Sequence, residues 1–257
     1  MLIDTHCHLN FPQYDADRAM VIGNAKKAGV KRFINPGVDA TSSQQAVTLA
    51  RKHPGVIFAA IGIHPYEAQH DPEINKLYTI YNDNKNSIVA IGECGLDYHQ
   101  YKGEAALGKK DKQKRLFAGQ LELALAYDLP VIFHCRDAFD DFFDVLDTLP
   151  SQPRGTIHCF SGGLQEVRQA QKRGFFLGFD GNTTYSKHLQ SIIPRIPLSM
   201  MLLETDAPYL TPAPHRGTRN EPKYIPLIAR EIASILSVSI ININDATTQN
   251  AQLLFRL

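Results

Sequence analysis

The sequence predicts an α/β protein, a single (β/α)8 TIM barrel, from three observations: short apolar runs typical of strands, helical stretches between them, and polar residues where the runs end. Strict alternation of strand and helix implies parallel pairing through right-handed crossovers, and eight such units in 257 residues match the size of a closed barrel. The eight predicted strands lie near residues 2–8, 32–36, 57–64, 88–94, 131–135, 155–159, 175–179 and 201–205.

In the segments between these runs, apolar residues recur at the spacing typical of helices. An open doubly wound sheet is the alternative layout, but the first strand is not followed by a Gly-x-Gly-x-x-Gly turn, which removes its commonest dinucleotide-binding form. We expect helices at residues 16–28, 42–53, 72–84, 112–127, 139–149, 164–173, 186–193, 222–236 and 245–255.

Length and composition predict one soluble domain. A chain of 257 residues with 44% hydrophobic residues can bury a full core, and no linker divides it, so we expect a single domain over 1–257. The net charge of +1 does not indicate a nucleic-acid or membrane partner, so any such partner must be recognised by a local part of the surface. Without a signal-like start or a run of about 18 apolar residues, we expect a cytoplasmic protein with no membrane partner. Without Trp or an obvious unpaired apolar stripe, we expect a monomer with no obligate protein partner.

Imidazole and carboxylate side chains end six of the eight predicted strands. In a barrel of this type the C-terminal strand ends surround the active site. Any one of these residues could be an ordinary core or surface side chain, but seven at the same end of successive strands predict a site. The seven residues are His6, His8, His64, Glu93, His134, His158 and Asp206.

This donor set predicts a binuclear metal centre. Neutral imidazole and carboxylate without thiolate suit Mg, Mn, Zn or Co. One ion would leave ligands unused, so we expect two divalent ions about 3.5 to 4 Å apart, the arrangement used on phosphate esters. Glu93 is the expected bridge because it is central in strand order. Asp4, His6 and His8 alternate along the first strand and are expected to share one of its faces.

Four cysteines each follow a candidate ligand directly. Adjacent side chains on a strand point to opposite faces, so these thiols should pack outside the sheet as buried, reduced residues. They are Cys7, Cys94, Cys135 and Cys159.

Taken in order, these motifs make the chain resemble the TatD family of metal-dependent deoxyribonucleases, in the amidohydrolase-like barrel superfamily. The resemblance covers nearly the whole length and implies a hydrolase of ester bonds in DNA. It also implies that one divalent ion is held by His6, His8, Glu93 and Asp206, and the second by Glu93, His134 and His158. The motifs are residues 4–9 (DTHCHL), 62–65 (GIHP), 92–98 (GECGLDY), 129–134 (LPVIFH), 158–162 (HCFSG) and 203–210 (LETDAPYL), followed by 216–217 and 220–222.

We expect phosphodiester hydrolysis by a water activated between two ions, with Asp206 and Glu93 as catalytic residues. Asp206 would orient the attacking water and take its proton. His64 would contact the scissile phosphate or protonate the leaving group, or else only cap its strand end. Arg136 and Arg216 would clamp a phosphate by paired hydrogen bonds, or else are ordinary surface arginines.

The expected substrate is DNA, attacked from a free end or on a single strand. The basic run over residues 102–115 could follow a nucleic-acid backbone or be a solvated loop. Two other hypotheses remain open because fold and ions do not choose a substrate: a metal-dependent hydrolase of a small-molecule amide or ester, and a non-catalytic metal-binding protein. Aromatic residues near strand ends could stack on bases or belong to the core: Tyr98, Tyr101, Phe160, Tyr185 and Tyr209.

Overall fold

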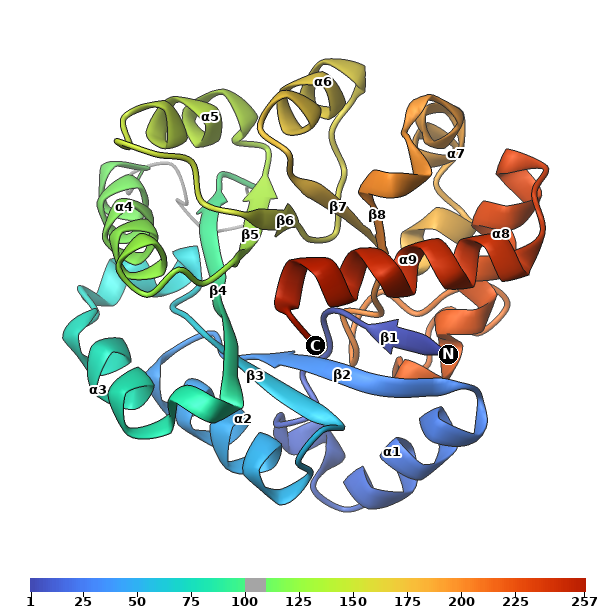
Figure 1. The fold of residues 1–257 in the computed structure, drawn as a ribbon, viewed down its shortest axis with the longest axis horizontal. Coiled ribbons are helices and arrows are strands. Elements are labelled where there is room, and N and C mark those ends of the chain that lie inside the picture. Colours follow the sequence, from blue (N-terminus) through green and yellow to red (C-terminus); the bar gives the residue numbers. More distant parts are fainter. Residues whose placement is uncertain (100–109) are drawn as a thin grey trace.

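The computed structural model describes residues 1–99 and 110–257. Eight parallel strands pair in sequence order from β1 to β8, and helices surround them on the outside (Figure 1). Backbone hydrogen bonds from Thr5 to Leu203 and from His8 to Ala207 join the first and last strands just beyond their ends, so the barrel is nearly closed. The predicted (β/α)8 barrel is confirmed.

The elements follow the predicted order. The strands are β1 (Leu2–Asp4), β2 (Val30–Pro36), β3 (Ile57–Ile61), β4 (Ile88–Asp97), β5 (Val131–Arg136), β6 (Gly155–Ile157), β7 (Phe176–Phe179) and β8 (Met201–Leu203). The helices are α1 (Arg18–Lys27), α2 (Ala40–Lys52), α3 (Asn75–Asn84), α4 (Lys110–Ala126), α5 (Phe139–Asp147), α6 (Leu164–Lys172), α7 (Lys187–Ile192), α8 (Ile225–Leu236) and α9 (Ile240–Phe255). Short 3-10 turns include η1 (Pro12–Tyr14), η2 (Pro65–His70) and η5 (Gly181–Thr184).

Several boundaries differ from the prediction, and hydrogen bonds explain two of the differences. β1 ends at Asp4, well before His8, because the Asp4 carboxylate accepts the backbone N–H of His6 and turns the chain. The last helix, α9, begins at Ile240 and not at residue 245, because the Ser239 hydroxyl accepts the N–H of Asn242 and caps it earlier.

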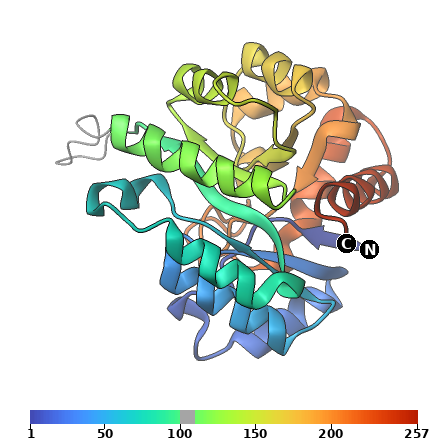
Figure 2. The same ribbon diagram turned by 60° about the vertical axis from the view of Figure 1, so that its left-hand side comes forward.

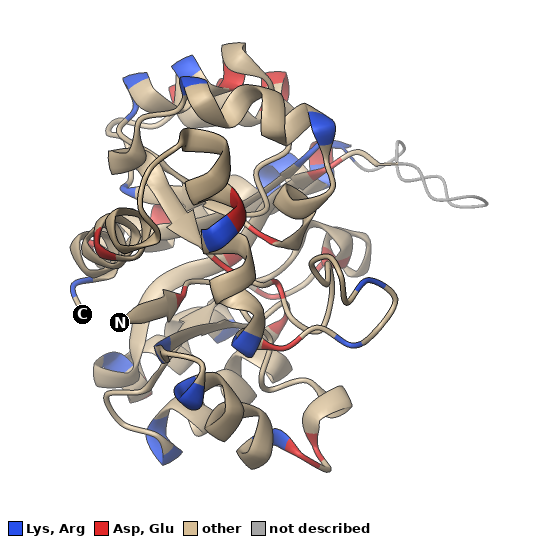
Figure 3. Cartoon of the chain, turned by 90° about the vertical axis from the view of Figure 1, so that its right-hand side faces the viewer, with Lys and Arg blue, Asp and Glu red and all other residues tan. Residues whose placement is uncertain are grey.

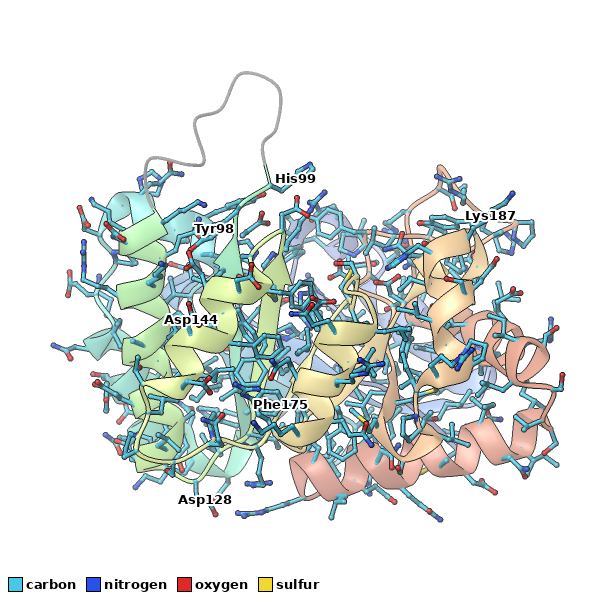
Figure 4. All side chains as sticks on the ribbon, turned by 90° about the horizontal axis from the view of Figure 1, so that it is seen from above. Tyr98, His99, Asp128, Asp144, Phe175 and Lys187 are labelled. Carbon is cyan, nitrogen blue, oxygen red and sulfur yellow. The ribbon has the colours of Figure 1, made fainter. Side chains whose placement is uncertain are left out.

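The amino-terminal end of the barrel is closed by α9, which crosses it in Figure 1. Apolar residues from six strands form a cluster inside this end and pack against three residues of the helix. Figure 4 shows His99 and Lys187 at the opposite end from α9. The polar strand ends therefore face the mouth that lies opposite this helix. The cluster consists of Ile3, Ile34, Ala60, Ala90, Ile132, Leu202, Ala251, Leu254 and Phe255.

In the described part of the chain, no single helix has the length and apolar character needed to cross a membrane. Residues Pro222–Leu236 and Ile240–Phe255 meet that test only together, as a pair bent by 114°.

Charges of both signs are interspersed over the side of the molecule drawn in Figure 3, as expected for a net charge of +1. Of the basic run predicted over 102–115, residues 102–109 lie outside the described residues. Lysines in the described remainder contact the protein itself: Lys112 pairs with Asp71 at 2.7 Å and Lys114 pairs with Asp141 at 2.8 Å. These two lysines are therefore poorly placed to follow a DNA backbone.

Two buried glutamines of α4 bind this helix to the ends of neighbouring strands. The helix itself lies beside β4 in Figure 2. The Gln120 amide accepts the N–H of Ile63 at 2.7 Å and donates to its carbonyl at 2.9 Å. Two helical turns earlier, Gln113 makes the same pair of bonds with Asp97, both at 2.9 Å. Each amide thus satisfies two buried backbone groups where a strand stops.

Replacing Gln120 by Leu should lower the free energy of unfolding by about 2 to 4 kcal/mol, since it leaves one buried donor and one buried acceptor unsatisfied. Urea denaturation followed by circular dichroism measures this. The matched control is Gln165→Leu on an exposed position of α6, which should change stability by less than about 0.5 kcal/mol. Equal stabilities of the two variants would contradict the fastening role of Gln120.

Candidate metal centre

Glu93, near the middle of β4, lies between two pairs of imidazoles. Its Oε2 atom is 3.3 Å from His6 Nε2 and 3.6 Å from His8 Nε2. Its Oε1 atom is 2.7 Å from His134 Nδ1 and 2.8 Å from His158 Nε2. One carboxylate therefore joins residues that follow β1 with residues of β5 and of the segment after β6.

Asp206 completes the cluster on the side of His6 and His8. Its Oδ1 atom is 3.6 Å from His6 Nε2 and 3.4 Å from His8 Nε2. Its backbone has a left-handed φ of 52°, an unusual conformation for a residue with a side chain and one that costs about 1 kcal/mol. The Asp206 N–H donates to the His6 carbonyl at 2.8 Å, which holds this conformation in place.

The donor atoms fit divalent cations. Nε2 of His6 lies 3.2 Å from Nε2 of His8, and Nδ1 of His134 lies 3.1 Å from Nε2 of His158. Neutral imidazoles and carboxylates converging in this way are ligands that Zn, Mn, Co and other divalent ions accept. Three groups have donor atoms within 4.8 Å of one another: His6 with His8 and Glu93, His6 with His158 and Asp206, and His64 with Glu93 and His134.

The acids of the cluster are ionised more easily than usual. Burial alone would raise the pKa of Glu93, but His158 and His6 outweigh it and hold the pKa well below its ordinary value. Burial likewise opposes a low pKa at Asp206, and the adjacent His8 and His6 overcome it. Both carboxylates therefore carry a negative charge at neutral pH, as metal ligands must.

Two of the imidazoles facing Glu93 Oε1, those of His158 and His134, hold protons more tightly than usual. Burial acts to lower the pKa of His158, but the charge of Glu93 raises it well above its ordinary value. At His134 burial is again outweighed, here by hydrogen bonds to Asp97 and Glu93, so its pKa is raised. In the protein without ions, these two residues therefore bind protons that a cation would have to displace.

A buried acid orients the outer nitrogen of His134. Asp97 Oδ2 lies 3.0 Å from His134 Nε2, and such a partner fixes the tautomer and the direction of a ligating imidazole. Glu204 Oε1 lies 3.6 Å from His158 Nδ1, which is an ion-pair distance and longer than a hydrogen bond. Asp97 was not predicted from the sequence, although period 2 along β4 places it on the same face as Glu93.

Asp4 acts on the backbone and lies behind the cluster. Its carboxylate accepts the N–H of His6 at 3.2 Å, the N–H of Thr205 at 3.0 Å and the hydroxyl of Thr205 at 2.6 Å. It therefore ties the turn that carries the first two histidines to the segment that carries Asp206.

His64 caps the turn that follows β3 and lies beside the donor cluster, while its role toward a substrate stays a prediction. Its Nδ1 accepts the N–H of Tyr66 at 3.2 Å and so caps η2, while its Nε2 lies 3.6 Å from Glu93 Oε1. Burial, together with His134, lowers its pKa to about 3, so the ring is neutral.

The two predicted arginines lie outside the donor cluster. Arg136 is the last residue of β5, two positions after His134, and is partly buried. Arg216 is exposed in the segment between β8 and α8, and its guanidinium lies 4.0 Å from the centre of the Tyr185 ring.

The cysteines are free, as predicted. Cys7, Cys94 and Cys135 are buried in the main apolar cluster, whereas Cys159 is partly exposed because its backbone turns at a φ of 47° directly after His158.

Comparison with known proteins agrees with this geometry. The family model of TatD-related DNases matches residues 3–256. A Bacillus subtilis protein named as the uncharacterized metal-dependent hydrolase YabD is 39% identical over the full length of both chains. A Pectobacterium carotovorum protein named 3'-5' ssDNA/RNA exonuclease TatD is 33% identical, also over both full lengths. A crystal structure of YjjV, a TatD homologue from Escherichia coli, superposes with a TM-score of 0.91 at 31% identity, covering 100% of this chain and 98% of that one.

The eight-stranded parallel barrel, the clustered imidazoles and carboxylates at its mouth, and these relatives place the chain among the metal-dependent hydrolases. Within that class, the chain belongs to the family of TatD-related DNases, enzymes that hydrolyse ester bonds.

Metal binding should release protons, because His134 and His158 must lose theirs to present lone pairs. Isothermal titration calorimetry of the metal-free protein with Zn²⁺ or Mn²⁺, in two buffers of different ionisation enthalpy, measures the protons released. We expect release at pH 7 and an affinity that rises from pH 6 to pH 8, and the same result for His53→Gln, a substitution outside the cluster. Identical heats in both buffers would contradict the assignment of these imidazoles.

Proposed function

We propose that this protein hydrolyses phosphodiester bonds of DNA, from a free end or on a single strand, with two divalent ions held around Glu93. The observation that carries the proposal is the division of the Glu93 oxygens, Oε2 facing His6 and His8, and Oε1 facing His134 and His158. The name of the Pectobacterium relative, an exonuclease on single-stranded DNA and RNA, supports a nucleic-acid substrate.

Asp206 lies near the first pair of histidines, so His6, His8, Asp206 and Glu93 would hold one ion, and His134 and His158 would hold the other together with Glu93. Ions there would neutralise charge on the phosphate oxygens and acidify a water molecule. In catalysis, Asp206 orients the attacking water and accepts its proton. Its lowered pKa keeps it ionised and able to do so at neutral pH.

The tautomer of His64 gives it a separate role. Since its Nδ1 accepts a hydrogen bond from Tyr66 and its pKa is low, the neutral ring carries its proton on Nε2. That N–H points to the Oε1 side of the centre and can donate to a phosphate oxygen or to the leaving group. Arg216, at the rim, is assigned to a neighbouring phosphate, and Arg136 to a phosphate closer to β5.

The proposal extends to the form of the protein: residues 1–257 act as one domain and one monomer in the cytoplasm. These statements remain predictions from the sequence.

A substrate panel tests the reaction class. The metal-stripped protein is reloaded with Mg, Mn, Zn or Co in turn and given single-stranded DNA, double-stranded DNA, a chromogenic phosphodiester, and amides and carboxylic esters. We expect hydrolysis of the phosphodiesters, faster on single-stranded than on double-stranded DNA. If only amides or carboxylic esters are cleaved, the protein is a small-molecule hydrolase and not a nuclease. If no substrate is cleaved with any of the four metals, the protein is a non-catalytic metal-binding protein.

Asp206→Asn should lower kcat on single-stranded DNA by about 100-fold or more, because the variant lacks the proton acceptor. Metal content by elemental analysis should fall much less, since an amide oxygen can still face the ion. The control, Asp140→Asn at an exposed site on α5, should keep wild-type kcat. Wild-type turnover by the Asp206→Asn variant, or loss of metal in proportion to activity, would refute the role of Asp206 as base.

A further inference from the structure

We propose that Tyr209 and Phe11 form a stacking platform for an unpaired nucleobase beside the metal centre, on the side of His8 and Asp206. This inference rests on the proposed function and adds the substrate group that is recognised next to the scissile phosphate.

Tyr209 is held at the mouth by the same turn that positions Asp206. Its N–H donates to the Asp206 carbonyl at 2.8 Å, so the ring follows the catalytic segment closely. Despite this fixed position, 49% of the residue is exposed. An aromatic ring anchored through its backbone and open on its side chain can bind a flat ligand with little loss of conformational entropy.

Phe11 connects this open ring to the metal cluster. It stacks on His8 with ring centroids 4.4 Å apart and planes 16° from parallel, and it meets Tyr209 edge-to-face at 6.5 Å. The three rings form a continuous aromatic edge from a predicted ligand to solvent. A single exposed apolar side chain would be unremarkable, but an exposed ring continuous with a ligand of the reaction centre marks a place for substrate.

The other aromatic candidates from the sequence lack such an open position where the structure describes them. Tyr98 and Phe160 are only 8% and 2% exposed and belong to the core. Tyr185 donates its hydroxyl to Asn182 and has the Arg216 guanidinium over its ring. Tyr209 is therefore the described candidate whose side chain is best exposed for a base.

Stacking on this platform would favour single strands as substrate. Every base has a π face, so stacking tolerates any sequence and contributes roughly 5- to 150-fold in affinity per base. A base inside a duplex has both faces covered by its neighbours and cannot reach Tyr209 unless the end opens.

The test uses the metal-loaded enzyme and single-stranded oligonucleotides that contain one abasic (tetrahydrofuran) nucleotide. In one oligonucleotide this nucleotide lies on the 5' side of the scissile bond, and in a second it lies on the 3' side. The measured quantity is kcat/KM on the intact strand divided by kcat/KM on the abasic strand. For wild type we expect a ratio of about tenfold or more on one side of the bond. Tyr209→Leu should bring that ratio close to one, and Tyr209→Phe should keep it. Tyr81→Leu, the same substitution on α3, is the matched control and should keep the wild-type ratio.

A second readout does not depend on turnover. The fluorescent base 2-aminopurine, placed at the position identified by the ratio, should be quenched on binding to wild type and to Tyr209→Phe, but not to Tyr209→Leu. A wild-type ratio near one on both sides, or an unchanged ratio in Tyr209→Leu, overturns the platform and leaves the proposed function intact. Failure of the wild type to cleave any oligonucleotide overturns the proposed function, and the platform with it.

Discussion

The structure depends on a negative charge buried at the mouth of the barrel. Glu93 is 4% exposed, and an isolated ionised carboxylate at such depth would be strongly destabilising. Its two oxygens instead face five imidazoles, those of His6, His8, His64, His134 and His158, and Asp206 faces two of the same rings. Without metal ions, protons bound to the imidazoles balance the negative charge of the two carboxylates. Bound divalent cations would balance the same charge. The same electrostatic requirement therefore produces both the stability of the site and its affinity for metal.

Hydrogen bonds between the ends of the strands hold these imidazoles and carboxylates in position. Asp4 connects the turn after β1 to Thr205 after β8, and the N–H of Asp206 reaches back to His6. On the opposite side, Gln113 and Gln120 hold the ends of β4 and β3 against α4. These contacts use backbone groups, so the ligands are held by parts of the chain that do not themselves take part in chemistry.

The fold and the convergence of the predicted ligands could be inferred from sequence. Both depend on the periodicity of apolar residues and on the order of strands and helices along the chain. The outer partner Asp97 was missed because the predicted strand stops at residue 94, just before Gly95. In fact β4 continues to Asp97, and a Cβ at Gly95 would collide with the His134 carbonyl, so close strand approach requires glycine there. The exposure of Tyr209 depends on tertiary contacts that no local pattern contains. The cap of α9 is different, because Ser239 lies only three residues before the N–H that it accepts, so this start of the helix was readable from sequence and was overlooked.

Closure of the barrel by α9 has a consequence for any long polymer that this protein acts on. Apolar side chains fill the interior at this end, so a polymer strand cannot pass through the barrel. Such a strand can approach the clustered imidazoles and carboxylates only from the opposite mouth. Entry and release therefore have to use one and the same opening.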